Sequence, residues 1–220
     1  MNEQRIQLDF KARYYKLGEI NEATLQVWFV LHGYGQLAQY FLRKFNSLEA
    51  KNICVIAPEG LSRFYLEDIN TRSQGGSSRV GATWMTKEDR LTDIENYVTY
   101  LNSIYRKELA GLTSIPPVTL LGFSQGVATV ARWALYGSVQ FQRMILWAGI
   151  LPPDMDFELG KDKVRGKEVI QVYGKQDPFI NADRLEEMKK LCDQLEITPQ
   201  LIEYDGKHEI DESVLGQLIR

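Results

Sequence analysis

The sequence predicts an α/β protein with a mostly parallel central sheet and helices on both faces. Short apolar runs, such as residues 118–121, alternate along the chain with stretches of helical periodicity. Turn-forming residues separate them, as Pro116 and Pro117 do before that run. The chain has 220 residues, 44% of them hydrophobic, which is enough for a substantial core. We therefore expect a single domain over residues 1–220.

The N-terminal part of the chain supplies the first strands and the first helix. Residues 5–17 alternate between apolar and polar side chains, which predicts a half-buried strand or hairpin at a sheet edge. Residues 24–31 form a denser apolar run, typical of a buried strand. Residues 37–48 carry apolar side chains at helical spacing. Residues 53–57 predict another buried strand, which Pro58 stops.

Residues 59–87 predict a long irregular segment with a glycine- and serine-rich middle at residues 73–78. Loops this long inside a compact domain tend to be functional. A solvated insertion is the alternative interpretation. A helix is predicted to follow over residues 89–109, with apolar side chains along one face.

The C-terminal half repeats the alternation of strand and helix. The predicted strands are residues 118–121, 143–147, 169–173 and 200–204. The predicted helices are one that ends near residue 136 and those at residues 183–195 and 212–219. Residues 149–166 are predicted to be a loop, so we expect no cap domain between the flanking strands. In such sheets ligands bind beyond the carboxyl ends of the strands.

Residues 122–126 (Gly-Phe-Ser-Gln-Gly) have the pattern G-x-S-x-G between a predicted strand and a predicted helix. Ser124 on such a tight turn exposes its Oγ at the top of the sheet, where a base can reach it. The N–H of Gln125, at the start of the helix, has no intrahelical partner and points to where an oxyanion would develop. A chance match is the alternative, but the flanking patterns favour a nucleophile at Ser124.

The chain has two histidines. His208 follows a predicted strand, and proteins with this elbow carry their partners in the order serine, acid, histidine. His208 is therefore the predicted general base for Ser124. A surface loop histidine is the alternative interpretation. We expect His32 to shape its own loop by hydrogen bonding.

The acid that orients His208 must lie between it and the serine in the sequence. Asp177 follows a predicted strand, and Pro178 stiffens the turn and biases Asp177 towards an extended backbone. A carboxylate there would hold the imidazole tautomer and stabilise the imidazolium. Asp154, after a different strand, is the runner-up. A purely turn-forming role for Asp177 is the alternative.

Residues 32–35 (His-Gly-Tyr-Gly) place two glycines just after a predicted strand. Such a loop lets a backbone N–H approach a ligand closely. We expect the N–H groups of Tyr34 and Gln125 to form an oxyanion hole. A plain glycine-rich turn is the alternative.

Several classes of partner are not expected. The net charge of −3 does not favour nucleic acid. Neither G-x-G-x-x-G nor G-x-x-x-x-G-K-[ST] is present, so no nucleotide phosphate cradle is expected. Two histidines in separate roles and no C-x-x-C leave little for a metal site, so we expect no metal and no cofactor. Cys54 and Cys192 are expected to be reduced packing residues.

The start of the chain lacks the apolar segment of a signal peptide, and the run at residues 27–31 is too short to span a bilayer. We therefore expect a cytoplasmic protein without stable membrane insertion. The sequence makes no prediction of oligomeric state.

Four segments together resemble the phospholipase/carboxylesterase family of α/β-hydrolases, which includes acyl-protein thioesterases and bacterial esterases. They are residues 31–35, 122–126, 174–178 and 206–209. The match spans nearly the whole chain in the right order. It implies the α/β-hydrolase fold without a cap domain and a serine hydrolase that cleaves carboxylic esters or thioesters through an acyl-enzyme.

The resemblance also implies the roles of individual residues. Its catalytic triad falls on Ser124, Asp177 and His208. Trp84 is implied to line the acyl site, because relatives carry a similar aromatic residue after their long loop. Apart from the resemblance, the aromatic residues Tyr34, Trp84 and Phe179 near the strand ends are expected to form a shallow apolar wall beside an open site, which predicts a preference for short to medium acyl esters.

Other functions remain open at this point. A thioesterase or lysophospholipase belongs to the same class of enzyme, and the same triad also cleaves amides in peptidases. A non-turnover small-molecule receptor on the α/β-hydrolase fold is the alternative outside enzymes. Such a receptor would react once with a substrate and remain covalently labelled, without further turnover.

Overall fold

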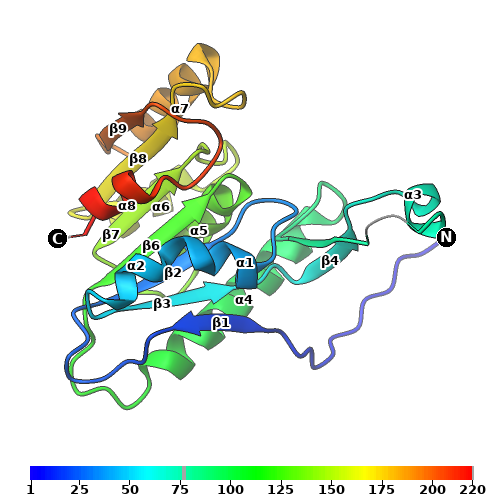
Figure 1. Ribbon diagram of the computed structural model, residues 1–220, viewed down its shortest axis with the longest axis horizontal. Helices are drawn as coiled ribbons and strands as arrows, with labels where there is room; N and C mark the ends of the chain where they lie inside the picture. The colour runs from blue at the N-terminus through cyan, green and yellow to red at the C-terminus, as the bar shows by residue number, and fades with distance from the viewer. Residues whose placement is uncertain (76–77, 220) are drawn as a thin grey trace.

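The structure is a computed structural model that describes residues 1–75 and 78–219. Seven strands form a mixed sheet in the order β1-β3-β2-β6-β7-β8-β9, in which only the edge pair β1–β3 is antiparallel (Figure 1). The strands are β1 (Tyr14–Leu17), β2 (Gln26–Leu31), β3 (Ile53–Pro58), β6 (Val118–Phe123), β7 (Arg143–Trp147), β8 (Glu168–Gly174) and β9 (Gln200–Tyr204). The predicted mostly parallel sheet is confirmed.

Helices cover both faces of this sheet (Figure 1). One face carries α4 (Arg90–Leu109), α5 (Gln125–Tyr136), α6 (Phe157–Val164) and α7 (Ala182–Gln194). The other face carries α1 (Ala38–Leu42), the 3-10 turn η1 (Arg43–Phe45), α2 (Asn46–Glu49) and α8 (Glu212–Gln217). The helix predicted at residues 37–48 is thus three short turns. Within residues 1–75 and 78–219 we find no helix with the length and hydropathy needed to cross a bilayer.

The strands are apolar on both faces because helices cover both. In β2, Val27 and Phe29 pack into one hydrophobic cluster, whereas Trp28 and Val30 pack into the other. Successive side chains of a strand point to opposite faces. A continuous apolar run is therefore the expected sequence of a central parallel strand, and the prediction from residues 24–31 is confirmed.

The edge strand predicted at residues 5–17 is only partly right. Just Tyr14–Leu17 pairs with β3, and Ile6, Leu8 and Phe10 are 86%, 67% and 59% exposed. The pairing ends one residue before Tyr14, where the N–H of Glu59, directly after the end of β3 at Pro58, donates to the carbonyl of Arg13 at 3.3 Å. Alternation of side chains without a neighbouring strand does not bury a face.

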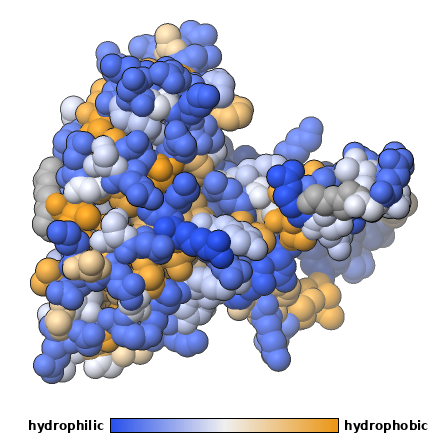
Figure 2. Space-filling view, viewed as in Figure 1, coloured by the Kyte–Doolittle hydropathy of each residue, from blue (hydrophilic) through white to orange (hydrophobic). Residues whose placement is uncertain are grey.

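The irregular segment predicted at residues 59–87 is wrong in part. It contains a two-stranded sheet of β4 (Ser62–Tyr65) and β5 (Val80–Thr83), joined through α3 (Ile69–Ser73). We call residues 61–83 the arm; Figures 1 and 2 show its α3 end standing off from the body of the molecule. Residues 76 and 77 of the predicted glycine- and serine-rich stretch lie outside the described residues.

The loop predicted at residues 149–166 is also only partly right, because its second half forms α6. Asp156 caps this helix by accepting the N–H of Leu159 at 3.0 Å. The buried side of α6 at Val164 belongs to the core beneath the sheet. The helix therefore packs on a face of the sheet, like its neighbours α5 and α7.

Candidate active site

Ser124 lies on a strained turn between β6 and α5. Its backbone has φ 54° and ψ −116°, and its N–H donates to the carbonyl of Trp147 at 2.9 Å. The flanking glycines are required by space: a Cβ at Gly122 would lie 2.2 Å from the oxygen of Gly126, and one at Gly126 would lie 2.2 Å from the oxygen of Leu31. Strain of this kind persists where the surroundings over-determine it.

His208 and Asp177 are hydrogen bonded, with Nδ1 2.7 Å from Oδ2. The Asp177 side chain is 0% exposed and that of His208 is 21% exposed. The other carboxylate oxygen of Asp177 accepts the N–H of Phe179 at 2.9 Å. A carboxylate only accepts, so Nδ1 of His208 carries the hydrogen, and in the neutral ring this tautomer makes Nε2 the acceptor.

Backbone contacts bring the two loops that carry these residues together. The N–H of Lys175 donates to the carbonyl of Tyr204, and that of Gln176 donates to the carbonyl of Gly206, both at 2.9 Å. These bonds extend the parallel pairing of β8 and β9 past the ends of the strands. The carboxylate and the imidazole therefore meet at the carboxyl edge of the sheet, as the sequence predicts.

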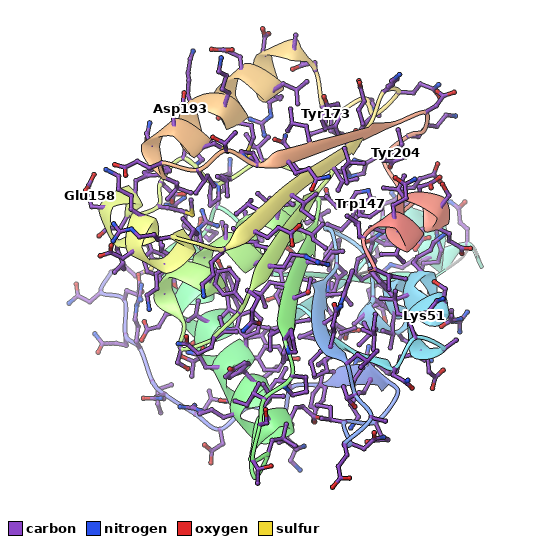
Figure 3. The ribbon with its side chains drawn as sticks, turned by 90° about the vertical axis from the view of Figure 1, so that its left-hand side faces the viewer. Lys51, Trp147, Glu158, Tyr173, Asp193 and Tyr204 are labelled. Carbon is purple, nitrogen blue, oxygen red and sulfur yellow. The ribbon has the colours of Figure 1, made fainter. Side chains whose placement is uncertain are left out.

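Trp147 and Tyr204 brace the loop that carries His208 (Figure 3). Both polar tips meet the carbonyl of Glu209: the indole N–H of Trp147 donates to it at 2.9 Å, and the hydroxyl of Tyr204 donates to it at 2.6 Å. Sequence reasoning missed both residues. No local pattern marks them, because their partner is a backbone oxygen on a loop distant in the sequence from Trp147.

The imidazole stands directly beside the elbow. The ring of His208 lies 4.9 Å from that of Phe123, which precedes the serine, and 4.8 Å from that of Phe179. On the other side of the elbow, a Cβ built on Gly33 would lie 3.1 Å from Cβ of Ser124. The structure thus gathers the elbow, the histidine loop and the glycine loop at one place.

The glycine loop is held on both sides of Tyr34. The N–H of Gly33 donates to Oε1 of Gln36 at 2.8 Å, and the N–H of Gly35 donates to the carbonyl of Ala82 in β5 at 2.9 Å. The peptide of Tyr34 is fixed between these two bonds. Gln125 is the first residue of α5, where a backbone N–H has no intrahelical partner.

His32 is a buried structural residue. Its Nε2 accepts the N–H of Gly60 at 3.0 Å, so its Nδ1 carries the hydrogen that is donated to the carbonyl of Gly33 at 2.8 Å. Burial lowers the pKa of His32 to about 4, although the nearby Glu59 carboxylate opposes the shift. The ring is neutral at neutral pH, in agreement with the expectation that it shapes its loop.

The two aromatic residues predicted for the acyl site lie in different environments. Trp84 is 2% exposed, and its indole N–H donates to the carbonyl of His32 at 2.8 Å. Its ring packs between those of His32 and Tyr97, so it presents no surface to an acyl chain. The wall role expected of it is therefore not supported, because the indole is needed inside the core. Phe179, in contrast, is 65% exposed.

Asp154, the runner-up acid, is committed elsewhere. It accepts from the buried guanidinium of Arg132 at 2.6 Å and also pairs with Arg90. Burial raises the pKa of the Asp154 carboxyl, but the hydrogen bonds and charges of Arg132 and Arg90 outweigh it and lower the pKa below its usual value. This carboxylate serves an ion-pair network between α4, α5 and the loop after β7.

The thiols offer no competing nucleophile. Cys54 and Cys192 are free and buried, and burial raises their pKa to about 11 and about 12. A thiol must be ionised to react, so both are inert at neutral pH. Among the described residues, no three His, Cys, Asp or Glu side chains form a group that could hold a metal ion.

Solved structures with the same fold include hydrolases of low sequence identity. Esterase PE8 is 18% identical with a TM-score of 0.67, and covers 96% of this chain and 100% of its own. Acyl-protein thioesterase 2 from Zea mays is 14% identical with a TM-score of 0.67, at 94% and 96% coverage. The Bacillus cereus carboxylesterase is 15% identical with a TM-score of 0.64, at 94% and 91%. These likenesses establish the α/β-hydrolase fold.

No curated protein matches the chain. The profile of the phospholipase/carboxylesterase family matches residues 19–220, which include every segment gathered at the elbow. This chain therefore belongs to the phospholipase/carboxylesterase family of α/β-hydrolases.

Proposed function

We propose that this protein is a serine esterase that hydrolyses carboxylic esters of short to medium acyl chains through an acyl-enzyme. The observation that carries the proposal is the 2.7 Å bond between His208 and the buried carboxylate of Asp177, beside the strained elbow of Ser124. A histidine oriented by a buried carboxylate next to a serine is the arrangement that activates a hydroxyl nucleophile.

The proposed steps follow from the hydrogen bonds. Asp177 holds the Nδ1–H tautomer of His208, which leaves Nε2 free to take the proton of Ser124 as Oγ attacks the ester carbonyl. The N–H groups of Tyr34 and Gln125 stabilise the oxyanion. His208 then protonates the departing alcohol. Water attacks the acyl-enzyme by the same route and releases the carboxylic acid.

Covalent labelling and turnover test the proposal. We expect a fluorophosphonate to label the wild-type protein and not Ser124→Ala, and we expect repeated turnover of nitrophenyl acetate. Labelling that persists in Ser124→Ala would overturn the assignment of the nucleophile. One round of labelling without turnover would instead indicate a receptor. Matched nitrophenyl esters and acyl-thioesters decide between an esterase and a thioesterase.

A further inference from the structure

The side chain of Gln125 ties the start of α5 to the end of β5. Its Nε2 donates to the carbonyl of Met85 and to Oγ1 of Thr83, both at 2.9 Å. Its Oε1 accepts the backbone N–H of Trp84 at 3.2 Å. The residue whose N–H is proposed for the oxyanion hole is therefore clamped by its own amide to residues 83–85.

Trp84 continues this connection to the second proposed oxyanion donor. Its indole N–H donates to the carbonyl of His32 at 2.8 Å, and its ring lies 5.0 Å from the imidazole. His32 in turn donates to the carbonyl of Gly33, the residue before Tyr34. One buried residue thus joins the helix start on one side to the glycine loop on the other.

This chain of bonds connects the two residues whose N–H groups are proposed for the oxyanion hole. An oxyanion hole stabilises charge only when both donors stand within hydrogen-bonding distance of one oxygen. Misplacement of about 1 Å by a residue remote from the chemistry can cost on the order of 100-fold in rate. The spacing of the N–H groups of Tyr34 and Gln125 depends on what connects them.

We propose that Trp84 is a positioning residue for the oxyanion hole, which it holds through its backbone N–H to Gln125 and its indole N–H to His32. This assignment rests on the proposed esterase function. It replaces the acyl-wall role expected of Trp84 from the sequence. It predicts that Trp84 affects the stabilisation of the transition state and leaves the binding of the ground-state ester unchanged.

Trp84→Phe tests the assignment, because it removes the indole N–H and keeps an aromatic ring. We expect kcat for nitrophenyl acetate to fall about tenfold or more, with KM within about twofold of wild type. An alkyl trifluoromethyl ketone places a hemiketal oxyanion in the hole, so its inhibition constant should rise by the same factor as kcat falls.

Trp133→Phe is the matched control. Trp133 is 0% exposed, against 2% for Trp84, and the substitution likewise removes one bond, from its indole N–H to Oδ1 of Asn102 at 3.0 Å, on the core side of α5. We expect its kcat and inhibition constant to stay within about twofold of wild type at a similar loss of melting temperature. Equal kinetic effects of the two variants would overturn the positioning role.

A second variant keeps the test decisive if Trp84→Phe does not fold. Gln125→Met keeps the backbone N–H and the length of the side chain but removes the amide clamp. We expect the same fall in kcat at constant KM, and wild-type kcat would overturn the assignment. A wild-type protein without turnover would overturn the proposed esterase function and this assignment together. Turnover by wild type with an unaffected Trp84→Phe would overturn the assignment alone.

Discussion

At the scale of single residues, the carboxylates of Asp154 and Asp177, which follow β7 and β8, have different kinds of partner. Asp177 is buried against His208, whereas Asp154 is held by two arginines. The sequence favoured Asp177 for its rigid turn after a strand. It could not exclude Asp154, because the partners of Asp154 lie on helices far away in the chain.

Substitution of the two aspartates should therefore have opposite consequences. We expect Asp177→Asn to lower kcat on the order of 10⁴-fold, because the amide no longer enforces the productive imidazole tautomer. Asp154→Asn should leave kcat within about twofold but lower the melting temperature, because the buried Arg132 loses its counter-charge. Steady-state kinetics and thermal unfolding of both variants check this. A large loss of kcat in Asp154→Asn together with a small loss in Asp177→Asn would reverse the assignment of the acid.

His32 should make the stability of the fold depend on pH. Its pKa is about 4 in the folded state against 6.5 ordinarily, so the unfolded chain binds the proton first as the pH falls. Stability from this group is complete above about pH 6.5 and is lost progressively towards pH 4. The free energy of unfolding should fall by about 2 kcal/mol between pH 7 and pH 5 through His32 alone.

Urea unfolding of wild type and His32→Gln at pH 7 and pH 5 checks this expectation. Glutamine retains an acceptor for the N–H of Gly60 but does not titrate, so the variant should be less stable at pH 7 and less sensitive to acid. An identical pH dependence in the two proteins would show that the acid sensitivity comes from other groups.

At the scale of elements, the arm supports the glycine loop. The strand β5 pairs with this loop through the carbonyl and N–H of Ala82, which contact Gly35 and Gln36. Gly81 is needed there, because a Cβ on it would lie 2.4 Å from the oxygen of Gly35. The segment that the sequence predicted as irregular is therefore ordered at its base, where it contacts the proposed oxyanion loop.

Gly81→Ala should damage activity through this contact. We expect the added methyl to push the loop away from β5, to cost about 1–3 kcal/mol of stability and to lower kcat at least tenfold. Gly216→Ala is the control, because a Cβ there meets nothing within 4 Å and Gly216 lies in helix α8. That variant should keep wild-type kcat and gain about 0.5–1 kcal/mol. Equal kcat in both variants would contradict the role of the arm.

The central strands of the sheet could be predicted from the sequence, whereas the strands β4 and β5 of the arm could not. Central strands such as β2 and β6 are buried on both faces, so their composition alone identifies them. Within the part of the chain that the structure describes, the strands β4 and β5 pair only with each other and with a loop, and most of Ser62–Tyr65 is exposed. Their pairing depends on contacts between distant segments, which local composition does not encode.

In the candidate site too, residues marked by a local pattern could be predicted from the sequence, whereas contacts between distant residues could not. Ser124, Asp177 and His208 each follow a strand, and topology brings the ends of parallel strands together, so spacing and order were enough to predict that these three residues lie at one edge of the sheet. The clamp of Gln125 on Trp84 joins residues far apart in the sequence and could not be predicted from it. The expected surface role of Trp84 failed for the same reason: burial is a property of the assembled fold.

At the scale of the whole molecule, the exposed aromatic side chains around the elbow, which we call the rim, predict the acyl chain lengths that the proposed esterase prefers. Phe179, whose ring lies 4.8 Å from that of His208, and Tyr34 in the glycine loop are 65% and 60% exposed, so each offers an apolar surface near the elbow. Each buried CH₂ contributes roughly 0.8 kcal/mol, but only over the methylenes that the rim covers. We expect kcat/KM to rise over the first few acyl carbons and then to level.

Phe179→Ala should flatten that rise and leave the acetate ester little affected. Phe10→Ala is the matched control, because Phe10 is similarly exposed, at 59%, on the N-terminal segment. Nitrophenyl esters from acetate to palmitate check the expectation. A kcat/KM that climbs steadily to palmitate would contradict it and favour a lysophospholipase.

The order of strands in the sheet also has a consequence for the synthesis of the protein. Ser124 follows β6, which pairs with β2 and β7, whereas His208 follows β9, the last strand of the chain and the edge of the sheet. Chains emerge from the ribosome and begin to fold from the N-terminus. When only the residues up to the end of β8 have emerged from the ribosome, the nascent chain contains the elbow and the glycine loop but not the imidazole of His208. In the proposed mechanism the serine thus stays inactive until the final strand has docked.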